Sequence, residues 1–165
     1  MRLAGNPSPG DGQPVEAGVR FRAADRGELG ALLELYEHLH IEDTPLPDRA
    51  AVCAVWESIL ADPKVHCLVA EAGGTLVSSC MLAIIPNLTR GARPYGHIEN
   101  VVTHADYRKR GIGTRLLQHA LQVAWDTGCY KVMLSTSRKD EAVMRFYEGS
   151  GFRRGVKTGF VATPE

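Results

Sequence analysis

Hydrophobic positions follow two different periods along this 165-residue chain, and each change of period marks a new element. Apolar residues recur at helical spacing in residues 29–39, 52–60 and 112–124. Continuous apolar runs at residues 19–23, 65–72 and 75–85 predict strands, and Gly73-Gly74 between the last two predicts a tight hairpin turn. Asp25 and Asp48 precede the first two helices and can cap their N-termini.

The second half of the chain continues the alternation of strands and helices. Strands are predicted at residues 98–103 and 130–135, on either side of a central helix that ends at Gly128. A short helix over residues 140–149 is followed from Phe152 by final strands, which include residues 157–162. The order is β-α-α-β-β-β-α-β-α-β, which predicts an α/β protein with a mixed sheet.

Length and composition predict one domain over residues 18–165, preceded by a disordered tail at residues 1–17 that is rich in Gly and Pro. Nineteen basic and nineteen acidic residues cancel, so we expect no nucleic acid and no membrane surface as partner. The N-terminus lacks the apolar core of a signal peptide, and we expect a cytoplasmic protein.

Two groups of potential metal ligands are weak candidates. The four cysteines stand among apolar neighbours without C-x-x-C spacing, which favours buried free thiols over a disulfide or a zinc site. His38 and His40 in HLHIED lie two residues apart, a spacing that points to different faces of a helix. We therefore expect no metal, and a helix end leading into a loop.

A basic, glycine-rich segment at residues 108–114, RKRGIGT, joins the 98–103 strand to the central helix. The first N–H groups of a helix have no partner within it, and the helix dipole adds positive charge there. Gly111 and Gly113 would let an anion approach the main chain closely. The segment is neither a Walker loop nor G-x-G-x-x-G, because Leu116 stands where the third glycine belongs. A phosphate cradle and a tight strand-to-helix turn with a solvated basic face both fit this segment alone.

Two stretches resemble the motifs of the GCN5-related N-acetyltransferase (GNAT) family. VVTHADYRKRGIGTRLL is similar to its central acetyl-CoA motif, and RFYEGSGF is similar to its second motif, in the same order along the chain. The resemblance implies the acyl-CoA N-acyltransferase fold, with a mostly antiparallel central sheet that splays at its middle strands. It also implies acetyl-CoA as co-substrate, a small-molecule or peptide amine as acceptor, and a homodimer. The implied contacts with acetyl-CoA are Val101, Val102, Thr103, Arg108, Lys109, Arg110, Gly111, Ile112, Gly113, Thr114 and Asp140.

Amine acetylation needs a base for the amine and an acid for the departing thiolate. Glu99 lies where the family often places its base, and alternation puts His97, Glu99 and Val101 on one face if no bulge intervenes. His97 and a water chain are alternative bases, while a structural sheet carboxylate remains an alternative for Glu99. The resemblance gives Tyr147 the role of acid, and core packing is the other reading of this residue.

Several alternatives stay open. Asp140 stands where the family commonly has an asparagine, so that contact with acetyl-CoA is in question. HIENVV and GCYKVML resemble the glucosamine-phosphate N-acetyltransferases, but the LSTS segment does not. A non-catalytic acyl-CoA-binding sensor is the second hypothesis, and a covalent route through Cys80 or Cys129 is a third. Arg90, Arg93 and Arg138 could bind an anionic acceptor or be solvated loop residues.

Overall fold

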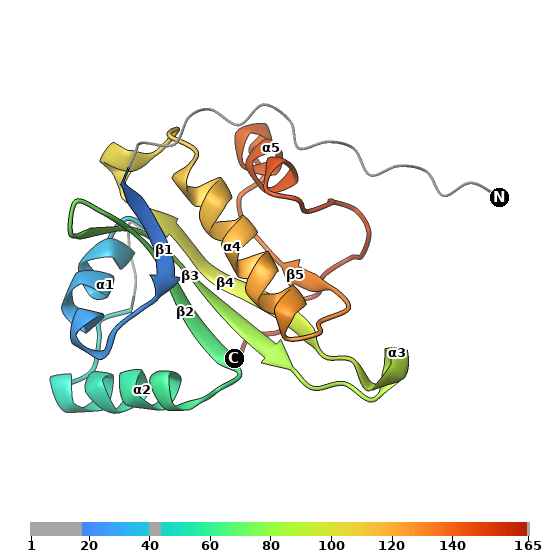
Figure 1. The fold of residues 1–165 in the computed structure, drawn as a ribbon, viewed down its shortest axis with the longest axis horizontal. Coiled ribbons are helices and arrows are strands. Elements are labelled where there is room, and N and C mark those ends of the chain that lie inside the picture. Colours follow the sequence, from blue (N-terminus) through green and yellow to red (C-terminus); the bar gives the residue numbers. More distant parts are fainter. Residues whose placement is uncertain (1–17, 40–43, 165) are drawn as a thin grey trace.

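The structure is a computed structural model that describes residues 18–39 and 44–164. One five-stranded sheet has the order β1-β2-β3-β4-β5, so every strand lies beside its neighbour in the chain (Figure 1). The strands are β1 (Val19–Ala23), β2 (Val65–Ala72), β3 (Thr75–Ile85), β4 (Tyr95–Thr103) and β5 (Val132–Leu134). The helical elements are η1 (Arg26–Glu28), α1 (Leu29–Tyr36), α2 (Arg49–Ala61), α3 (Thr89–Ala92), η2 (Ala105–Tyr107), α4 (Ile112–Asp126) and α5 (Glu141–Gly149).

Strands β1 to β4 pair antiparallel and only β5 runs parallel to its partner β4. This confirms the predicted mixed, mostly antiparallel sheet. Of the antiparallel pairs, β2 and β3 have the shortest connection, a hairpin that turns at Gly73 and Gly74, both with positive φ. The parallel β5 requires a crossover, which α4 provides.

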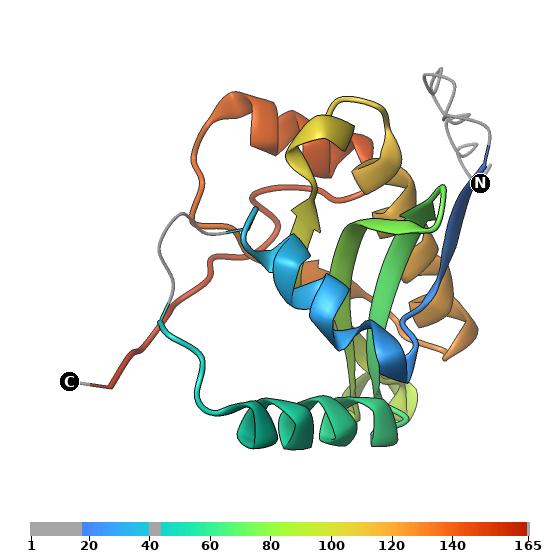
Figure 2. The same ribbon diagram turned by 90° about the vertical axis from the view of Figure 1, so that its left-hand side faces the viewer.

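Helices cover both faces of the sheet, and α1 and α4 lie on opposite sides of it (Figure 2). The apolar stripe of α4 buries Leu116, Leu117 and Ala120 against Leu82 and other strand residues. On the opposite face, α1 and α2 bury residues that include Leu32, Leu35 and Trp56. Each fully buried Leu stabilises the fold by about 1.5–3 kcal/mol, so these two clusters hold the ends of the sheet in place.

A β-bulge interrupts the pairing of β3 with β4. Ser79 pairs with Val102 and Met81 pairs with Glu99, so β4 carries one residue more than β3 between these pairs. The extra residue is accommodated near Asn100, which has a left-handed φ of 53°. Because the bulge resets the alternation, Val101 packs on the α4 side with Ile98 and does not share a face with Glu99.

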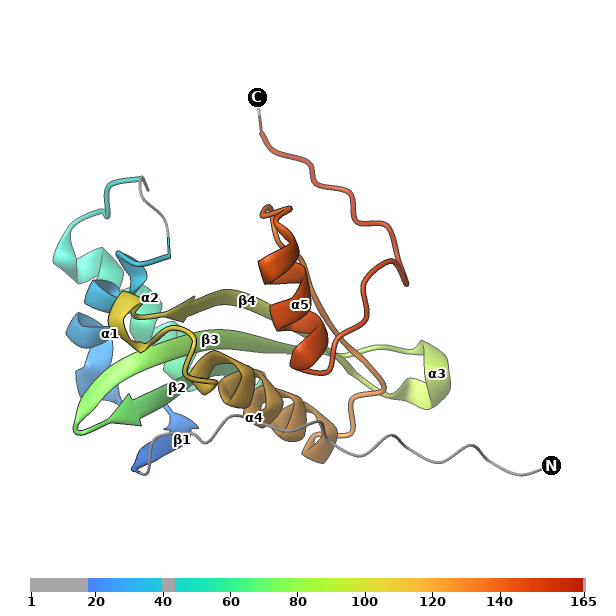
Figure 3. The same cartoon turned by 90° about the horizontal axis from the view of Figure 1, so that it is seen from above.

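Strands β4 and β5 separate soon after they meet. Their pairing covers only Gly96–Ile98 against Val132–Leu134, after which β4 continues alone to Thr103. The edge of β4 beyond Ile98 is therefore open, and α5 follows β5 beyond this gap (Figure 3). A cavity lies where the two strands separate, lined by the end of β4 and the loop after β5.

The prediction of C-terminal strands is wrong. Residues 153–164 contain no strand, and Val156, Phe160 and Val161 are 62%, 93% and 88% exposed. Alternating apolar residues form a strand only against a sheet edge, and these residues lie on none; Gly155 adds a turn with φ 73°. The 130–135 strand is shortened to β5, and the expected loop before β4 contains α3.

Some other predictions from the sequence can be compared with the structure and some cannot. The predicted tail at residues 1–17 and His40 of the weak metal candidate lie outside the described residues. Cys67, Cys80 and Cys129 are buried free thiols, as predicted, and Cys53 is a half-buried one. Within residues 18–39 and 44–164, no helix is long and apolar enough to cross a membrane.

Candidate active site

A cavity of about 710 Å³ opens where β4 and β5 separate. Its wall combines the end of β4, the start of α4, the loop after β5 and the inner side of α5. These elements are distant in sequence, and the splay brings them together. The residues that line it are His38, Leu39, Ile98, Glu99, Asn100, Val101, Val102, Thr103, Tyr107, Arg108, Lys109, Gly111, Gly113, Thr114, Ser135, Thr136, Ser137, Arg138, Val143, Phe146, Tyr147 and Val161.

The N-terminus of α4 is open towards this cavity. Gly111 is the N-cap residue, in the left-handed conformation with φ 74°, and no side-chain hydrogen bond caps the helix at this described position. The first N–H groups of the 15-residue helix thus have no intrahelical acceptor. Such groups, together with the positive end of the helix dipole, fit the pyrophosphate of acetyl-CoA.

Gly113 serves close packing at the same helix start. A Cβ added there would lie 3.1 Å from Thr103 Oγ1 and 3.2 Å from Phe146 Cε2, tighter than ordinary contacts. Thr103 is held in turn by Ser78, whose buried Oγ lies 2.8 Å from Thr103 Oγ1 and donates to the Val102 carbonyl at 2.6 Å. Glycine at this position therefore lets α4 approach β4 and α5 together.

The three basic residues before the glycines have different surroundings. Arg108 donates from Nε to the Thr103 carbonyl at 3.0 Å and from Nη2 to the His38 carbonyl at 3.0 Å, which joins the loop to the end of α1. The Arg110 guanidinium lies 5.0 Å from the centre of the Tyr107 ring and is not part of the cavity wall. Lys109 lines the cavity with φ 60°, and Ile112 turns its side chain into the core.

Glu99 and His97 form a hydrogen-bonded pair, although the sequence offered them as alternatives. His97 Nε2 lies 2.7 Å from Glu99 Oε1, and only Glu99 lines the cavity. Both side chains point to one face of β4 because the bulge follows them. Proton transfer from Glu99 to His97 needs no rearrangement at this distance.

Tyr147 lies across the cavity on α5, half-buried between Phe146 and Phe152. Burial raises the pKa of its phenol above the usual value, and the negative charge of Glu99 raises it further. The phenol is therefore protonated at neutral pH and can donate a proton. Glu99 and Tyr147 both line the cavity.

Asp140 has a structural partner on each side. Its carboxylate accepts a hydrogen bond from the Val143 N–H at 3.1 Å as N-cap of α5 and one from Arg138 Nε at 3.0 Å. These contacts lower the pKa of Asp140, the Val143 N–H more than Arg138. Asp140 is absent from the cavity wall, whereas Arg138 is part of it.

Several wall residues were not expected from the sequence. His38 reaches the cavity from the end of α1, Ser135, Thr136 and Ser137 follow β5, and Val161 comes from the C-terminal segment. Polar residues directly after a strand were the available signal for the 135–137 group. In the described parts of the chain, no group of three or more His, Cys, Asp or Glu could hold a metal ion.

Comparison with known proteins agrees with this architecture. The model of the acetyltransferase (GNAT) family matches residues 31–152. A glucosamine 6-phosphate N-acetyltransferase of Trypanosoma brucei brucei is 36% identical over 137 residues, 82% of this chain and 89% of that protein. A thialysine N-epsilon-acetyltransferase of Sus scrofa is 29% identical over 150 residues, 83% of this chain and 85% of that protein.

A solved structure from Agrobacterium tumefaciens str. C58, provisionally assigned as an acetyltransferase, is 46% identical with a TM-score of 0.82. It covers 88% of this chain and 99% of its own. The family match takes in β4, α4, β5 and α5, and the cavity wall is built mainly from β4, the start of α4, α5 and the loop after β5. The chain therefore belongs to the acetyltransferase (GNAT) family and is an acetyl-CoA-dependent N-acetyltransferase.

Proposed function

We propose that the protein transfers the acetyl group of acetyl-CoA to a primary amine of a small molecule or peptide by direct attack in a ternary complex. The observation that carries the proposal is the shared cavity, whose wall contains Glu99, Tyr147 and the open N-terminus of α4. A carboxylate and a protonated phenol there match the two proton transfers that the reaction needs.

In this proposal, the first N–H groups of α4 and the side chains of Lys109 and Thr114 hold the pyrophosphate. Val101, Val102 and Thr103 line the cavity at the open edge of β4. N–H groups alternate in direction along a strand, and the His104 N–H bonds to the Val77 carbonyl of β3. The N–H groups of Val101 and Thr103 therefore face the open edge and bind the acetyl oxygen and the pantetheine arm.

Glu99 accepts the proton of the ammonium, directly or through water, with His97 beside it. The neutral amine forms the new C–N bond as the C–S bond breaks, and the nitrogen releases one more proton to solvent as the amide forms. Tyr147 gives its proton to the departing thiolate and recovers one from solvent. The products are the acetylated amine and CoA with a free thiol.

Calorimetry with acetyl-CoA and desulfo-CoA, followed by thiol release in the same sample across an amine panel, tests the proposal. Glucosamine 6-phosphate and thialysine belong in the panel because relatives carry those names. We expect binding and thiol release with at least one amine. Binding without release from any amine would favour the alternative, a non-catalytic acyl-CoA sensor.

The proposal also includes a cytoplasmic location and a homodimer, for which the only basis is the sequence. Cytoplasmic location would be checked by fractionation of cells that express the tagged chain. Homodimerisation would be checked by light scattering at several protein concentrations, where a single mass of one chain would exclude it.

A further inference from the structure

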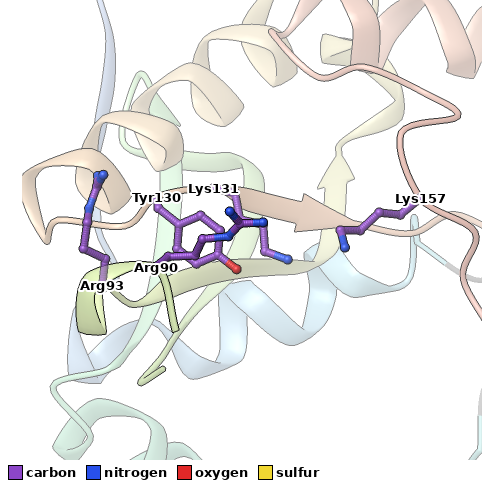
Figure 4. Close-up of a pocket in the computed structure, with 5 residues that line it drawn as sticks. All are labelled: Arg90, Arg93, Tyr130, Lys131 and Lys157. Carbon is purple, nitrogen blue, oxygen red and sulfur yellow. The ribbon is translucent and has the colours of Figure 1, made fainter. Parts of the chain in front are cut away.

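A second cavity, of about 490 Å³, lies between α3 and the start of β5 (Figure 4). Its wall consists of Tyr130 and four cations, and contains no acidic residue: Arg90, Arg93, Lys131 and Lys157. The chain as a whole has equal numbers of acidic and basic residues, so this concentration of positive charge is local. We refer to these five residues as the cationic pocket.

Two of the cations are fixed in place. Arg93 donates from Nε to the Gly128 carbonyl at 3.2 Å and from Nη2 to the Cys129 carbonyl at 3.1 Å. The Lys131 ammonium lies 5.0 Å from the centre of the Tyr95 ring and 5.4 Å from that of Tyr130. Both positive charges are thereby held without a neutralising carboxylate.

The other two cations extend into the pocket without a counter-charge. Among the residues that the structure describes, Arg90 and Lys157 form no ion pair with a carboxylate. Like charges gathered around one cavity repel each other, and a bound anion would relieve that repulsion. A multivalent anion would interact with several of these residues at once.

The backbone that presents Arg90 is strained. Arg90 and Ala92 have φ of 59° and 56°, in the left-handed region that residues with a Cβ seldom adopt. Asn87 braces this turn, because its Nδ2 donates to the Thr89 carbonyl at 2.7 Å and to the Arg93 carbonyl at 3.2 Å. Strain that the surroundings hold in place is typical of functional loops.

The cationic pocket lies on the same face of the sheet as Glu99. Tyr95, His97 and Glu99 alternate along β4, and the Lys131 ammonium stacks on Tyr95. Lys131 Nζ also lies 3.3 Å from the sulfur of Met133, the residue paired with His97. The Cα atoms of Tyr95 and Glu99 are roughly 13 Å apart along the strand.

The C-terminal segment connects the two cavities. Lys157 lines the cationic pocket and Val161 lines the cavity with Glu99 and Tyr147. Three residues lie between them, so their Cα atoms are at most about 14 Å apart.

We propose that the cationic pocket binds a phosphate monoester on the acceptor, while the acceptor's amine reaches Glu99. This inference rests on the proposed function and specifies its substrate class as phosphorylated primary amines. A phosphate monoester carries up to two negative charges and three free oxygens, which suits four cations better than one carboxylate does. The pocket would set the orientation of the acceptor, since it fixes the end opposite the amine.

Glucosamine and glucosamine 6-phosphate are matched probes, because they differ only in the phosphate. We expect thiol release with a kcat/KM at least tenfold higher for the phosphorylated amine. The double variant Arg90→Gln, Lys157→Gln should remove most of that ratio by raising KM and leave glucosamine unchanged. Arg153→Gln, an exposed arginine outside the pocket, is the control and should keep the ratio.

A binding measurement separates the pocket from the reaction. The protein is first saturated with CoA, so that the proposed phosphate site at the N-terminus of α4 is occupied. Inorganic phosphate should then shift the amide resonances of Tyr130 and Lys131, and sodium acetate should shift them less. The double variant should lose this response. Phosphate binding without acetylation of any amine would count against the proposed function and not against the pocket. A ratio unchanged in the double variant, or no response to phosphate, would overturn the inference.

Discussion

The charge of Glu99 acts on Tyr147 in the shared cavity, and the sign of that effect suits their proposed roles. A negative Glu99 makes it harder to ionise the phenol, so it adds to the effect of burial in raising the pKa of Tyr147. If Glu99 accepts a proton from the amine, its charge is neutralised and the phenol becomes a stronger acid. The proton donor would thus be strengthened at the stage when the thiolate leaves.

Replacing Tyr147 with Phe should slow turnover without weakening acetyl-CoA binding. Only the phenolic hydroxyl is removed, and the ring keeps its contacts with Phe146 and Phe152. Loss of a general acid typically lowers kcat by about 10²-fold or more. Stopped assays of thiol release measure kcat, and calorimetry with desulfo-CoA is the control for binding. Equal turnover in the two proteins would remove the acid role.

Replacing Glu99 with Gln should lower the pKa of Tyr147. The neutral amide no longer opposes ionisation of the phenol, but burial, the larger cause, remains, so the pKa should stay above the ordinary value. Absorbance at 295 nm across a pH titration measures the phenolate, with the Tyr147→Phe protein subtracted as reference. The same variant should lose most activity, and an unchanged phenol titration would show that the two groups do not interact.

At the scale of elements, the left-handed turn before α4 can be tested through Lys109. Asn and Asp tolerate positive φ better than most residues, so both should preserve the turn at φ 60°. Lys109→Asn removes a positive charge from the cavity and Lys109→Asp reverses it. We expect the Kd for acetyl-CoA to rise by roughly threefold and tenfold respectively, with smaller differences at high salt.

Lys64→Asp is the matched control, since Lys64 is exposed and outside both cavities. Its Kd for acetyl-CoA should equal that of the unmodified protein. Gly113 is a poorer site for this test, because any side chain there presses on Thr103 and Phe146 and would disturb packing as well as charge. If Lys109→Asn and Lys109→Asp bind acetyl-CoA with the same Kd as the unmodified protein, the charge of Lys109 takes no part in binding.

Elements with a strong local signal were predicted from the sequence. The β2 and β3 boundaries follow from two apolar runs around a Gly-Gly turn, and α4 follows from six apolar residues at helical spacing. The four-residue α3 has no period to detect. The C-terminal strand was predicted from residues 157–162, but strand formation depends on a free sheet edge, which a local pattern does not reveal.

In the candidate site too, features set by the local sequence were predicted and features set by long-range contacts were not. Residues 108–114 form one continuous segment, so the sequence alone placed them at a helix start. The bulge at Asn100 depends on the pairing of β3 with β4, and the pairing of His97 with Glu99 depends on side-chain conformation. His38 and Val161 come to the cavity from opposite ends of the chain. Sequence periodicity contains no information on such long-range contacts.

For the molecule as a whole, the first strand is secured by charge as well as by pairing. Arg22 on β1 donates to Glu28 of η1 at 2.6 Å and to Glu71 of β2 at 2.7 Å. These partners join the start of the domain to the element before α1 and to the next strand. Hydrogen bonds from Arg22 are the largest cause that lowers the pKa of both carboxyl groups.

The Arg22 network predicts how stability depends on pH. A carboxyl group whose pKa is lowered by folding stabilises the protein above its unfolded pKa, and that stability is lost as pH falls through the folded value. The Tm should therefore fall as the pH is lowered below about 4.3, the ordinary pKa of Glu. Arg22→Gln should lower the Tm at pH 7 and flatten its decline in acid, because Glu28 and Glu71 then titrate nearer to their unfolded values.

Arg154→Gln is the control for this prediction, since Arg154 pairs with Glu141 and both side chains are 55% exposed. Arg22 and Glu71 are only 27% and 13% exposed, so water screens their attraction less. Scanning calorimetry from pH 3 to pH 7 should show a clear effect for Arg22→Gln and little for Arg154→Gln. Parallel curves for Arg22→Gln and the unmodified protein would mean that the network contributes no pH-dependent stability. The first strand would then be held by its backbone pairing with β2 and its apolar contacts alone.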